Sequence, residues 1–582
     1  MKTNRTPRIP LAPGLDGLQP YRVAEHPAPV TLRLSGNEGP EVPATLRRFA
    51  DPFGDIVRCY PRTDDLEAEI AERLGLDPAR VLLTGGADDA LARAISLVAA
   101  PDREILVPAP TFEMIERYVQ LMGADLLTVP WWREGFPVAQ VLESLSEKTV
   151  AVVLVTPNNP TGQATTQAEI QQLLAGLGDR LLIVDQAYGE FAEEDTTPLL
   201  LRQPNVIITR TLSKAFGLAG LRIGIAIAPA ELVDRLRTVG QPYPVAGPSL
   251  AIAGRVLADD GSWQGEYLAR IREERDRLGK LLTALKQLPI PSHANFVLCE
   301  FEDAAWVADA MAGLGVAVRR FPGRRPLERS LRISLPGNQK GMERLERSLR
   351  AILAPEALLF DMDGVIANVR PSYRRAICET ASDFGVPVTD DEIETAKAAG
   401  DANNDWILTW RLICGQRPEV DYEEVRRIFE DRYQGTPQAP GLWREETLQI
   451  PRRQLERLAS WLPLAVVTGR PRRDAERFLA AFDLEDLFPV VISMEDGPAK
   501  PAPFPVLQAL QELGVERAWM VGDTPDDIRS ARAAGVVPLG FSSVPLSPVV
   551  EQTLLRAGAA RVLTDLSDLA GWLPASISRG VE

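Results

Sequence analysis

The stretch AVVLVTPNNPTG (151–162) is an apolar run that passes directly into a polar loop. The same pattern returns in LLIVDQAY (181–188) and VIITRTLSK (206–214). Short β-type runs that alternate with helical segments predict a mostly parallel α/β sheet. Ligands gather where the strands of such a sheet end, so the polar residues that follow these runs are expected to share one site.

An asparagine, an aspartate and a lysine follow the three runs: Asn159, Asp185 and Lys214. A pyridoxal 5'-phosphate site requires such a set, because the cofactor needs a polar partner for its ring oxygen, a carboxylate for its pyridinium nitrogen and an amine for its aldehyde. Lys214 is expected to hold the cofactor covalently and to act as the general base for the substrate α-proton. Tyr188 is placed to bond the ring oxygen beside Asn159.

The cofactor phosphate and ring have further candidate partners. The stretch LLTGGADDALARAI (82–95) runs from a strand through glycines into a helix, so the backbone amides of Ala87 and Asp88 are suited to cradle a phosphate. Phe112 follows another strand, where an aromatic ring can stack on the cofactor. Three more side chains suit the phosphate: Thr211, Ser213 and Arg222.

A second catalytic set opens at ALLFDMDGV (357–365), where the rhythm of strand and helix restarts. Asp361 and Asp363 follow an apolar run two residues apart, and period-two alternation can point both carboxylates the same way. This geometry suits a nucleophile beside an acid-base group. Asp361 would attack phosphorus, and Asp363 would protonate the leaving alcohol and then activate water.

An anion that attacks a phosphate needs positive charge nearby. Mg²⁺ prefers carboxylate oxygens, and Lys500 in AKPAP and Thr468 in VVTGR offer an ammonium and a hydroxyl to the phosphoryl oxygens. The expected metal ligands are Asp361, Asp363, Asp523 and Asp527.

The composition limits the class of protein. The chain has 582 residues with 45% hydrophobic and 25% charged residues, and it has no apolar run near the ~18 residues of a membrane span. Four scattered cysteines and two histidines disfavour a zinc site and a Ser-His-Asp triad. The net charge of −16 disfavours nucleic acid. We expect a cytoplasmic protein with small-molecule substrates, because MKTNRTPRIPLAPG lacks the apolar core of a secretory signal.

Residues 20–350 resemble a fold-type I aminotransferase, and specifically the histidinol-phosphate aminotransferase family. The resemblance rests on QPYR (19–22), LSGNEGP (34–40), CYPR (59–62), GGADD (85–89), NNPTG (158–162), SKAFGLAGLRIG (213–224) and LRIS (331–334). It implies a homodimer in which Tyr60 reaches the partner's cofactor phosphate, with glutamate as a typical amino donor. It also implies four substrate-binding residues: Tyr21, Asn37, Arg319 and Arg332.

Two departures from this family concern the substrate. The family's usual DEAY reads DQAY, with Gln186, and SLPGN (334–338) replaces a threonine-containing turn. Neither touches the cofactor chemistry. Both leave open another phosphorylated or carboxylated amine as substrate, including that of a threonine-phosphate decarboxylase-like enzyme.

The second half resembles the phosphatases of the haloacid dehalogenase superfamily. DMDGV, VVTGR, AKPAP and VGDTPDD occur in the superfamily's order over residues 357–545, and an acid-base aspartate at position 363 marks phosphatases. Specificity usually resides in the helical cap, where Asn403, Asn404 and Asp405 either read the substrate or cap a helix that buries Trp406 and Trp410.

The predicted organisation is therefore a transferase fold followed by a Rossmann-like domain with a cap. We expect an aminotransferase over 1–354, with a large domain at about 45–260 and a small domain from 1–44 and 261–354. The hydrolase would cover 355–582, with its core in 355–369 and 456–582 and its cap at about 370–455.

The leading hypothesis is a bifunctional enzyme that transaminates and then dephosphorylates in histidine biosynthesis. Its rivals keep both activities on another metabolite, or make the second half a module without catalysis.

Overall fold

The computed structural model describes residues 26–41, 55–399, 404–542, 548–574 and 577. Tyr21, predicted to bind substrate, lies outside these residues. The chain divides into two compact units, each considered by itself. The first contains Leu34–Phe301 and Arg319–Met342, and the second contains Ala24–Arg33, Glu302–Val318 and Glu343–Glu582. The domain boundary near residue 355 stays a prediction.

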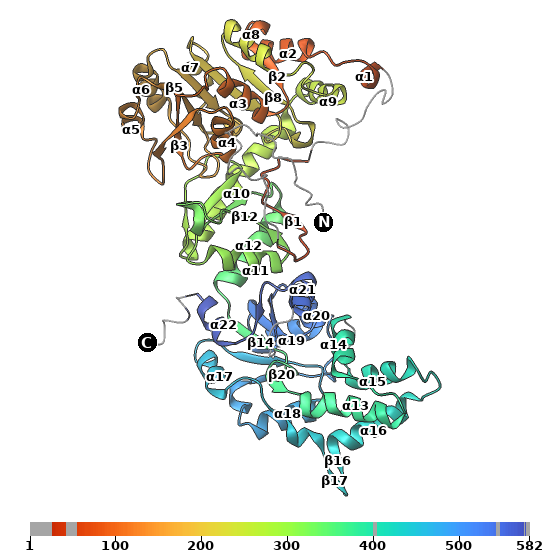
Figure 1. The fold of residues 1–582 in the computed structure, drawn as a ribbon. Coiled ribbons are helices and arrows are strands. Elements are labelled where there is room, and N and C mark those ends of the chain that lie inside the picture. Colours follow the sequence, from red (N-terminus) through yellow and green to blue (C-terminus); the bar gives the residue numbers. More distant parts are fainter. Residues whose placement is uncertain (1–25, 42–54, 400–403, 543–547, 575–576, 578–582) are drawn as a thin grey trace, which may run out of the picture. The chain divides into compact units, whose positions relative to one another are not determined.

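A seven-stranded sheet forms the centre of the first unit (Figure 1). Only β8 runs antiparallel to its neighbours, as expected for a mostly parallel sheet. The spatial order of the strands is β2 (Val81–Thr84), β8 (Gly224–Ile227), β7 (Val206–Thr211), β6 (Leu181–Asp185), β5 (Thr149–Val155), β3 (Glu104–Ala109) and β4 (Asp125–Pro130).

Both faces of this sheet are buried. Successive residues of a strand point to opposite faces, so Val152 and Leu154 of β5 join one apolar cluster while Val153 and Val155 join the other. This is why the strands read as continuous apolar runs rather than alternating ones. The helices of this part are α1 (Asp55–Arg58), α2 (Asp64–Leu74), α3 (Ala87–Ser96), α4 (Glu113–Leu121), α5 (Val138–Glu143), α6 (Gln167–Leu177), α7 (Thr197–Leu200), α8 (Ala230–Val239), α9 (Gly247–Ala258) and α10 (Ser262–Ala284).

A smaller antiparallel sheet completes the first unit. Its register places Arg319 directly opposite Arg332, so two predicted substrate arginines lie on neighbouring strands. The strand order is β12 (Arg319–Arg320), β13 (Ser330–Ser334), β10 (Phe296–Glu300) and β9 (Leu288–Pro289).

The second unit is built around a six-stranded parallel sheet. Its strand order is β20 (Val490–Ile492), β19 (Leu464–Val467), β14 (Ala357–Phe360), β21 (Ala518–Gly522), β22 (Val537–Phe541) and β23 (Val562–Leu563). The helices that accompany the sheet in sequence are α17 (Arg452–Ala459), α18 (Arg472–Ala481), α19 (Phe504–Leu513), α20 (Pro525–Ala533), α21 (Pro548–Ala557) and α22 (Ser567–Trp572). This unit also contains α11 (Ala304–Gly313) and the parallel pair β1 (Leu32–Arg33) and β11 (Val316–Ala317), while α12 (Gln339–Leu353) spans the division.

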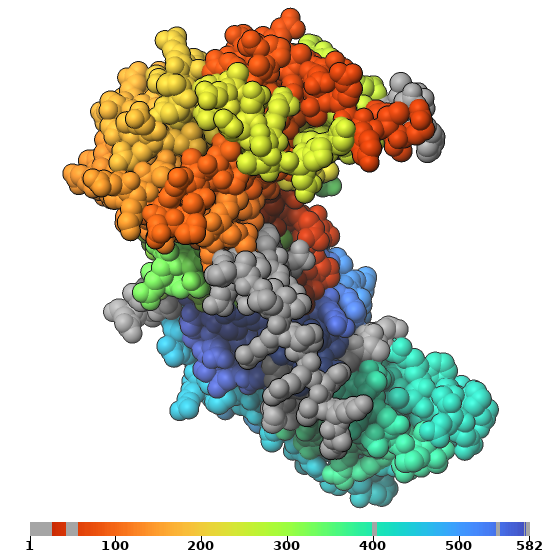
Figure 2. All heavy atoms as spheres, turned by 45° about the horizontal axis from the view of Figure 1, so that its top comes forward, coloured from red at the N-terminus to blue at the C-terminus, as the bar shows by residue number. Residues whose placement is uncertain are grey.

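Four α-helices lie between β14 and β18, in the stretch predicted to form a helical cap. Figure 2 shows this part of the second unit, coloured green to teal, gathered in one lobe. The helices are α13 (Arg375–Asp383), α14 (Asp390–Ala399), α15 (Asp405–Cys414) and α16 (Tyr422–Gln434). A π-helical turn, η6 (Arg370–Arg374), precedes them, and two short antiparallel pairs flank them: β15 (Ala367–Asn368) with β18 (Thr447–Leu448), and β16 (Gly435–Thr436) with β17 (Ala439–Pro440). Among all described helices, none has the length and apolar character that a membrane crossing needs.

Candidate functional sites

The carboxyl ends of the strands in the first unit open into a cavity of about 260 Å³. The expectation that polar residues after separate strands would meet is fulfilled here. The cavity is lined by thirteen of the predicted residues: Asn37, Ala87, Asp88, Phe112, Asn159, Asp185, Tyr188, Thr211, Ser213, Lys214, Arg222, Arg319 and Arg332.

Asp185 is a buried carboxyl group at the end of β6. The Thr209 hydroxyl donates to its Oδ1 at 2.9 Å, and the backbone N–H of Ala187 donates to the same atom at 3.1 Å. Burial nevertheless raises the pKa of Asp185 to about 7, because these two neutral donors do not replace water. A protonated pyridine nitrogen would supply the missing positive charge, so this carboxyl fits the cofactor ring.

Lys214 lies half-buried in the same cavity, with its Nζ 5.8 Å from the ring centroid of Tyr188. The Tyr188 hydroxyl is fixed by Asn37, whose Nδ2 donates to it at 3.0 Å. The Tyr188 ring also packs edge-on against Phe296. The amine of Lys214 thus lies in the same cavity as the buried Asp185 carboxyl, where an aldehyde could reach it.

The predicted phosphate cradle forms at the start of α3. Gly86 precedes the helix at φ 92°, and a Cβ there would lie 2.5 Å from Nη2 of Arg222, so the close approach requires glycine. Thr211 Oγ1 donates to Ser213 Oγ at 2.8 Å on the facing loop. The helix N-terminus, the two hydroxyls and Arg222, which now pairs with Asp88, form a site suited to a phosphate.

The two substrate arginines have different surroundings. Arg332 donates from Nη1 to Asn159 Oδ1 at 2.5 Å and from Nη2 to Ser35 O at 2.9 Å. The first bond leaves the Asn159 amide nitrogen for the cofactor's ring oxygen. Arg319 instead forms an ion pair with Glu113 at 3.0 Å, so a substrate acid would have to compete with that carboxylate.

Gln186 and Tyr60 lie outside this cavity. The Gln186 side chain is buried and hydrogen-bonds to Thr196 and Thr197, so the change from DEAY does not alter the cavity lining. Tyr60 is 78% exposed and stacks on Tyr243 at 4.6 Å. Its contact with a partner subunit stays a prediction.

A second group of predicted catalytic residues meets at the strand ends of the second unit. One carboxylate oxygen from each of Asp361, Asp523 and Asp527 lies within 4.8 Å of the other two. Lys500 Nζ donates to Asp361 Oδ1 at 2.6 Å and also pairs with Asp527. Thr468 follows β19, which is the strand beside β14.

The three carboxylates outnumber the one ammonium group between them. Burial raises the pKa of Asp361 well above its usual value, with Asp527 and Asp523 adding to the effect and Lys500 opposing it. Burial and Asp527 likewise raise the pKa of Asp523 to about 7. A divalent cation would balance this charge, and an all-oxygen ligand set suits Mg²⁺.

Asp363 was predicted to be a fourth metal ligand, but its carboxylate lies outside the group of side chains that could hold a metal. Among the described residues, the group able to hold a metal contains Asp361, Asp523 and Asp527 only. The Asp363 carboxylate instead pairs with Arg470. Gly364 follows at φ 78°, where a Cβ would lie 2.1 Å from Asp523 Oδ2, so the glycine of DMDGV lets the two loops meet.

Comparison with known proteins identifies both halves. The model of class I and II aminotransferases matches residues 35–349, which is more than half of the chain. The chain belongs to this family. The model of haloacid dehalogenase-like hydrolases matches residues 355–535, so the chain is a fusion of an aminotransferase and a hydrolase.

The aminotransferase half has relatives of known name. It is similar to a histidinol-phosphate aminotransferase of Caldanaerobacter subterraneus subsp. tengcongensis, with 32% identity over 58% of this chain and 97% of the relative. The crystal structure of histidinol-phosphate aminotransferase from Sinorhizobium meliloti in complex with pyridoxal-5'-phosphate matches with a TM-score of 0.51 and 28% identity, over 56% of this chain and 91% of that one.

A further relative is an imidazoleglycerol-phosphate dehydratase of Phytophthora nicotianae, 47% identical over 38% of this chain. The match covers 53% of that protein, so the chain spans about half its length.

In the hydrolase half, a buried charge network that the sequence did not reveal surrounds Arg470. This side chain is 1% exposed, and it pairs with Asp363 and, at 3.0 Å, with Glu446. Glu446 also accepts hydrogen bonds from Ser372 at 2.8 Å and Tyr433 at 3.1 Å. Arg470 is the last residue of VVTGR and lies in the loop that follows the buried strand β19. An arginine at this place was the only sign in the motif of a buried charge network. The network joins Asp363, the predicted acid-base residue, to Ser372 and Tyr433 at the two ends of the cap helices.

The cap also tests the prediction for residues 403–410. Asn404 caps α15, because its Oδ1 accepts from the backbone N–H groups of Trp406 and Ile407. The helix-cap interpretation is therefore confirmed for Asn404, while Asn403 lies outside the described residues. Trp406 and Trp410 are partly rather than fully buried. Asp405 forms an ion pair with Lys397 at 3.2 Å.

Replacing Lys214 by alanine should abolish covalent cofactor binding. The absorbance band of the enzyme-bound cofactor should disappear, and transamination should fall by about 10²–10⁴-fold or more with loss of the general base. The exposed Lys148→Ala variant is the matched control and should keep both. A band that persists in Lys214→Ala would assign the cofactor to another lysine.

The Asp185→Asn substitution should stabilise the cofactor-free protein at high pH. Burial raises the pKa of Asp185 in the folded protein to about 7, from its ordinary value of 3.8. The ionised carboxyl therefore destabilises the fold increasingly as pH rises from 4 to 7 and most fully above it. In urea unfolding at pH 8, the free energy of unfolding of Asp185→Asn should be larger than that of wild type. This difference in stability should disappear by pH 4. A difference that does not change with pH would contradict the role of burial.

The Arg470→Met substitution should destabilise the second unit by about 3–5 kcal/mol, because it leaves the buried Glu446 and the partly buried Asp363 without their cation. Arg452→Met removes a half-exposed ion pair with Glu456 and should cost at most about 1 kcal/mol. Urea unfolding followed by tryptophan fluorescence compares the two variants. An unchanged midpoint in Arg470→Met would show that the network does not support the fold.

Proposed function

We propose that the chain is a bifunctional enzyme that transaminates a phosphorylated keto substrate at one site and hydrolyses a phosphomonoester at the other. The observation that carries the proposal is the gathering of a separate catalytic set at the strand ends of each parallel sheet. Lys214 and Asp185 belong to one set, and Asp361, Asp523 and Lys500 belong to the other.

In the first half, the substrate class is proposed from similarity to histidinol-phosphate aminotransferases, one of which is matched over 97% of its length. Pyridoxal phosphate, when bound, supplies the electron sink for the substrate carbanion. Lys214 would move the α-proton, Asp185 would keep the ring nitrogen protonated and Arg332 would bind the substrate's acid group. Tyr60 would complete the site of the partner in a homodimer.

In the second half, Asp361 is proposed to attack phosphorus and form an aspartyl phosphate. Lys500 contacts Asp361 and would stabilise the charge of the transferred phosphoryl group together with Thr468. Asp363 would give a proton to the leaving alcohol and then take one from water. Asp361, Asp523 and Asp527 would hold Mg²⁺, which supplies the remaining positive charge. These carboxylates and Lys500 are intact, which speaks against a module without catalysis.

Two kinds of substrate are considered for the hydrolase half. Histidinol phosphate would make the two halves consecutive steps of histidine biosynthesis, in line with the named relatives. A phosphomonoester with a second anionic group is favoured by two arginines in the hydrolase pocket, Arg370 and Arg374.

Inorganic phosphate release by the purified protein with Mg²⁺ tests the hydrolase assignment. Asp361→Asn should lower release from any substrate by about 10³-fold or more, because it removes the nucleophile, and should leave transamination unchanged. Asp431→Asn, a change of the same kind on the exposed face of α16, should leave both activities unchanged. Release that survives in Asp361→Asn would contradict the proposed nucleophile.

Histidinol phosphate is the first substrate for this assay. Release that depends on Asp361 would support consecutive steps on one metabolite. Absence of release from histidinol phosphate, with release from other phosphomonoesters, would uncouple the two halves.

A further inference from the structure

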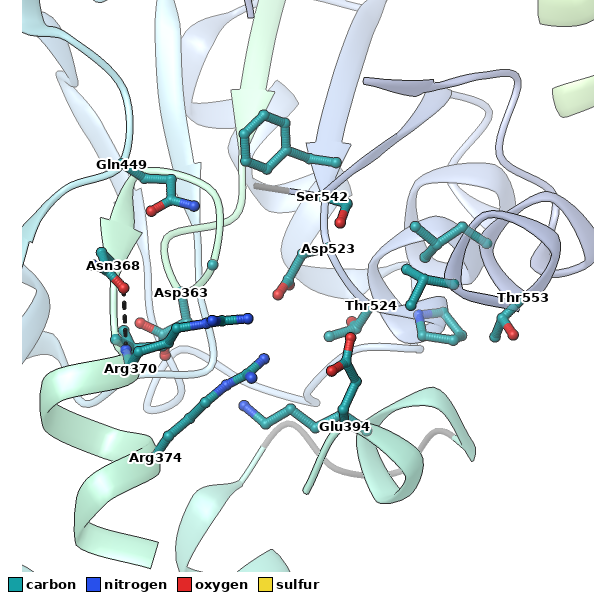
Figure 3. A pocket seen from close by; sticks show the side chains of 17 residues that line it. Asp363, Asn368, Arg370, Arg374, Glu394, Gln449, Asp523, Thr524, Ser542 and Thr553 are labelled. Carbon is teal, nitrogen blue, oxygen red and sulfur yellow. Dashed lines mark hydrogen bonds between the residues drawn. The ribbon is translucent and has the colours of Figure 1, made fainter. Parts of the chain in front are cut away.

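A pocket of about 90 Å³ lies in front of Asp363 and Asp523 on the cap side of the hydrolase site. Two of its lining residues, Arg370 and Arg374, lie at the two ends of η6. Side chains four residues apart share one face of a helical turn. Figure 3 shows both side chains pointing from this turn into the space beside Asp363, toward Asp523 and Thr524.

The two guanidinium groups are not neutralised within the part of the chain that the structure describes. Nη1 of Arg374 is buried without a hydrogen-bond partner. The adjacent Arg375, outside the pocket, pairs with Glu379 at 2.7 Å and Glu445 at 3.1 Å. Solvent would explain an exposed arginine such as Arg370, but it does not explain a buried donor of Arg374 left unpaired.

The other charges of the pocket are accounted for. Lys397 has Asp405 as its counter-ion at 3.2 Å. Asp363 and Asp523 belong to the catalytic set, and Glu394 is the remaining acidic side chain among the described lining residues. Apart from the catalytic carboxylates, the lining therefore carries an excess of positive charge.

The residues assigned to the transferred phosphoryl group lie elsewhere. Asp361, Thr468 and Lys500 do not line this pocket. Arg370 and Arg374 are thus placed for the part of the substrate that departs as the alcohol. The same pocket is lined by three apolar residues, Phe541, Val550 and Leu554, which suit a carbon skeleton.

We propose that Arg370 and Arg374 bind an oxyanion, a carboxylate or a second phosphate, on the alcohol portion of the substrate. A guanidinium group can pair with either in bidentate fashion. The proposal rests on the phosphomonoester hydrolysis proposed above, but not on histidinol phosphate as the substrate. An ammonium group in this pocket would face two guanidinium groups, so cationic substrates are selected against.

The test compares phosphomonoesters that differ at the far end. In the first pair, 3-phosphoglycerate has a carboxylate where glycerol 3-phosphate has a neutral hydroxyl group. In the second pair, fructose 1,6-bisphosphate has a second phosphate where fructose 6-phosphate has a hydroxyl group. Wild type should show at least tenfold higher kcat/KM for the anionic member of one pair, and the favoured pair identifies the oxyanion. Comparable values within both pairs, or a preference for histidinol phosphate, would overturn the proposal.

Variants assign the preference to the arginines. Arg374→Met and Arg370→Met should each lower kcat/KM for the favoured anionic substrate by about 10–100-fold, mainly through KM, as expected for loss of a charge-assisted contact. Their kcat/KM for the neutral member should change less than threefold. Arg375→Met is the matched control and should change neither. Equal losses on both members would place the arginines on the transferred phosphate instead.

Binding separates this proposal from the hydrolase assignment. Calorimetry on full-length Asp361→Asn with Mg²⁺ should show tighter binding of the anionic member, and this advantage should vanish in Asp361→Asn/Arg374→Met. If this Arg374-dependent binding is seen but wild type releases no phosphate, the hydrolase assignment is rejected and the oxyanion site is supported. Equal binding of both members would reject the oxyanion site.

Discussion

Both candidate sites depend on one constraint, which is that the carboxyl ends of parallel strands meet at one edge of a sheet. The strands of the first unit place mostly apolar side chains on both faces of their sheet. The predicted site residues Asp185 and Lys214 lie where a strand passes into its loop. Asp185 is the last residue of β6 and Asp361 directly follows β14, so each lies at the carboxyl end of a strand in its own sheet.

The same constraint creates an electrostatic cost at each site. Asp185 is buried with only neutral donors, and Asp361, Asp523 and Asp527 share one lysine. Burial raises the pKa of both Asp185 and Asp361. When no cation is bound, ionised carboxylates held in this way lower the stability of the folded protein. A bound cation would remove this cost. Active sites commonly lower stability in this way in favour of function.

The sequence predicted the residues that follow strands and failed for those that depend on packing between distant segments. Asp185, Lys214 and Asp361 were found because an apolar run marks each strand end. Arg470 was missed because its partners, Asp363 and Glu446, lie far away in sequence and its burial depends on the cap.

Contacts that form only in the folded chain also changed the expected roles. Asp363 was predicted as a metal ligand beside the other three aspartates, whereas in the folded chain its carboxylate pairs with Arg470 from another loop. Arg319 matched a family position, yet its ion pair with Glu113 joins segments about two hundred residues apart. Arg370 and Arg374 belong to no sequence motif. Their proposed role follows only from the folded structure, in which both line the pocket beside Asp363 and Asp523.

The central claim is that one chain holds two separate sites, each at the end of its own sheet. A crystal structure with pyridoxal phosphate, Mg²⁺ and vanadate, a mimic of the transferred phosphoryl group, tests it most directly. The account predicts density continuous between the cofactor and Lys214, and a metal bound by Asp361 and Asp523 beside vanadate at Asp361. Cofactor attached to a different lysine, or a metal bound away from these carboxylates, would contradict it.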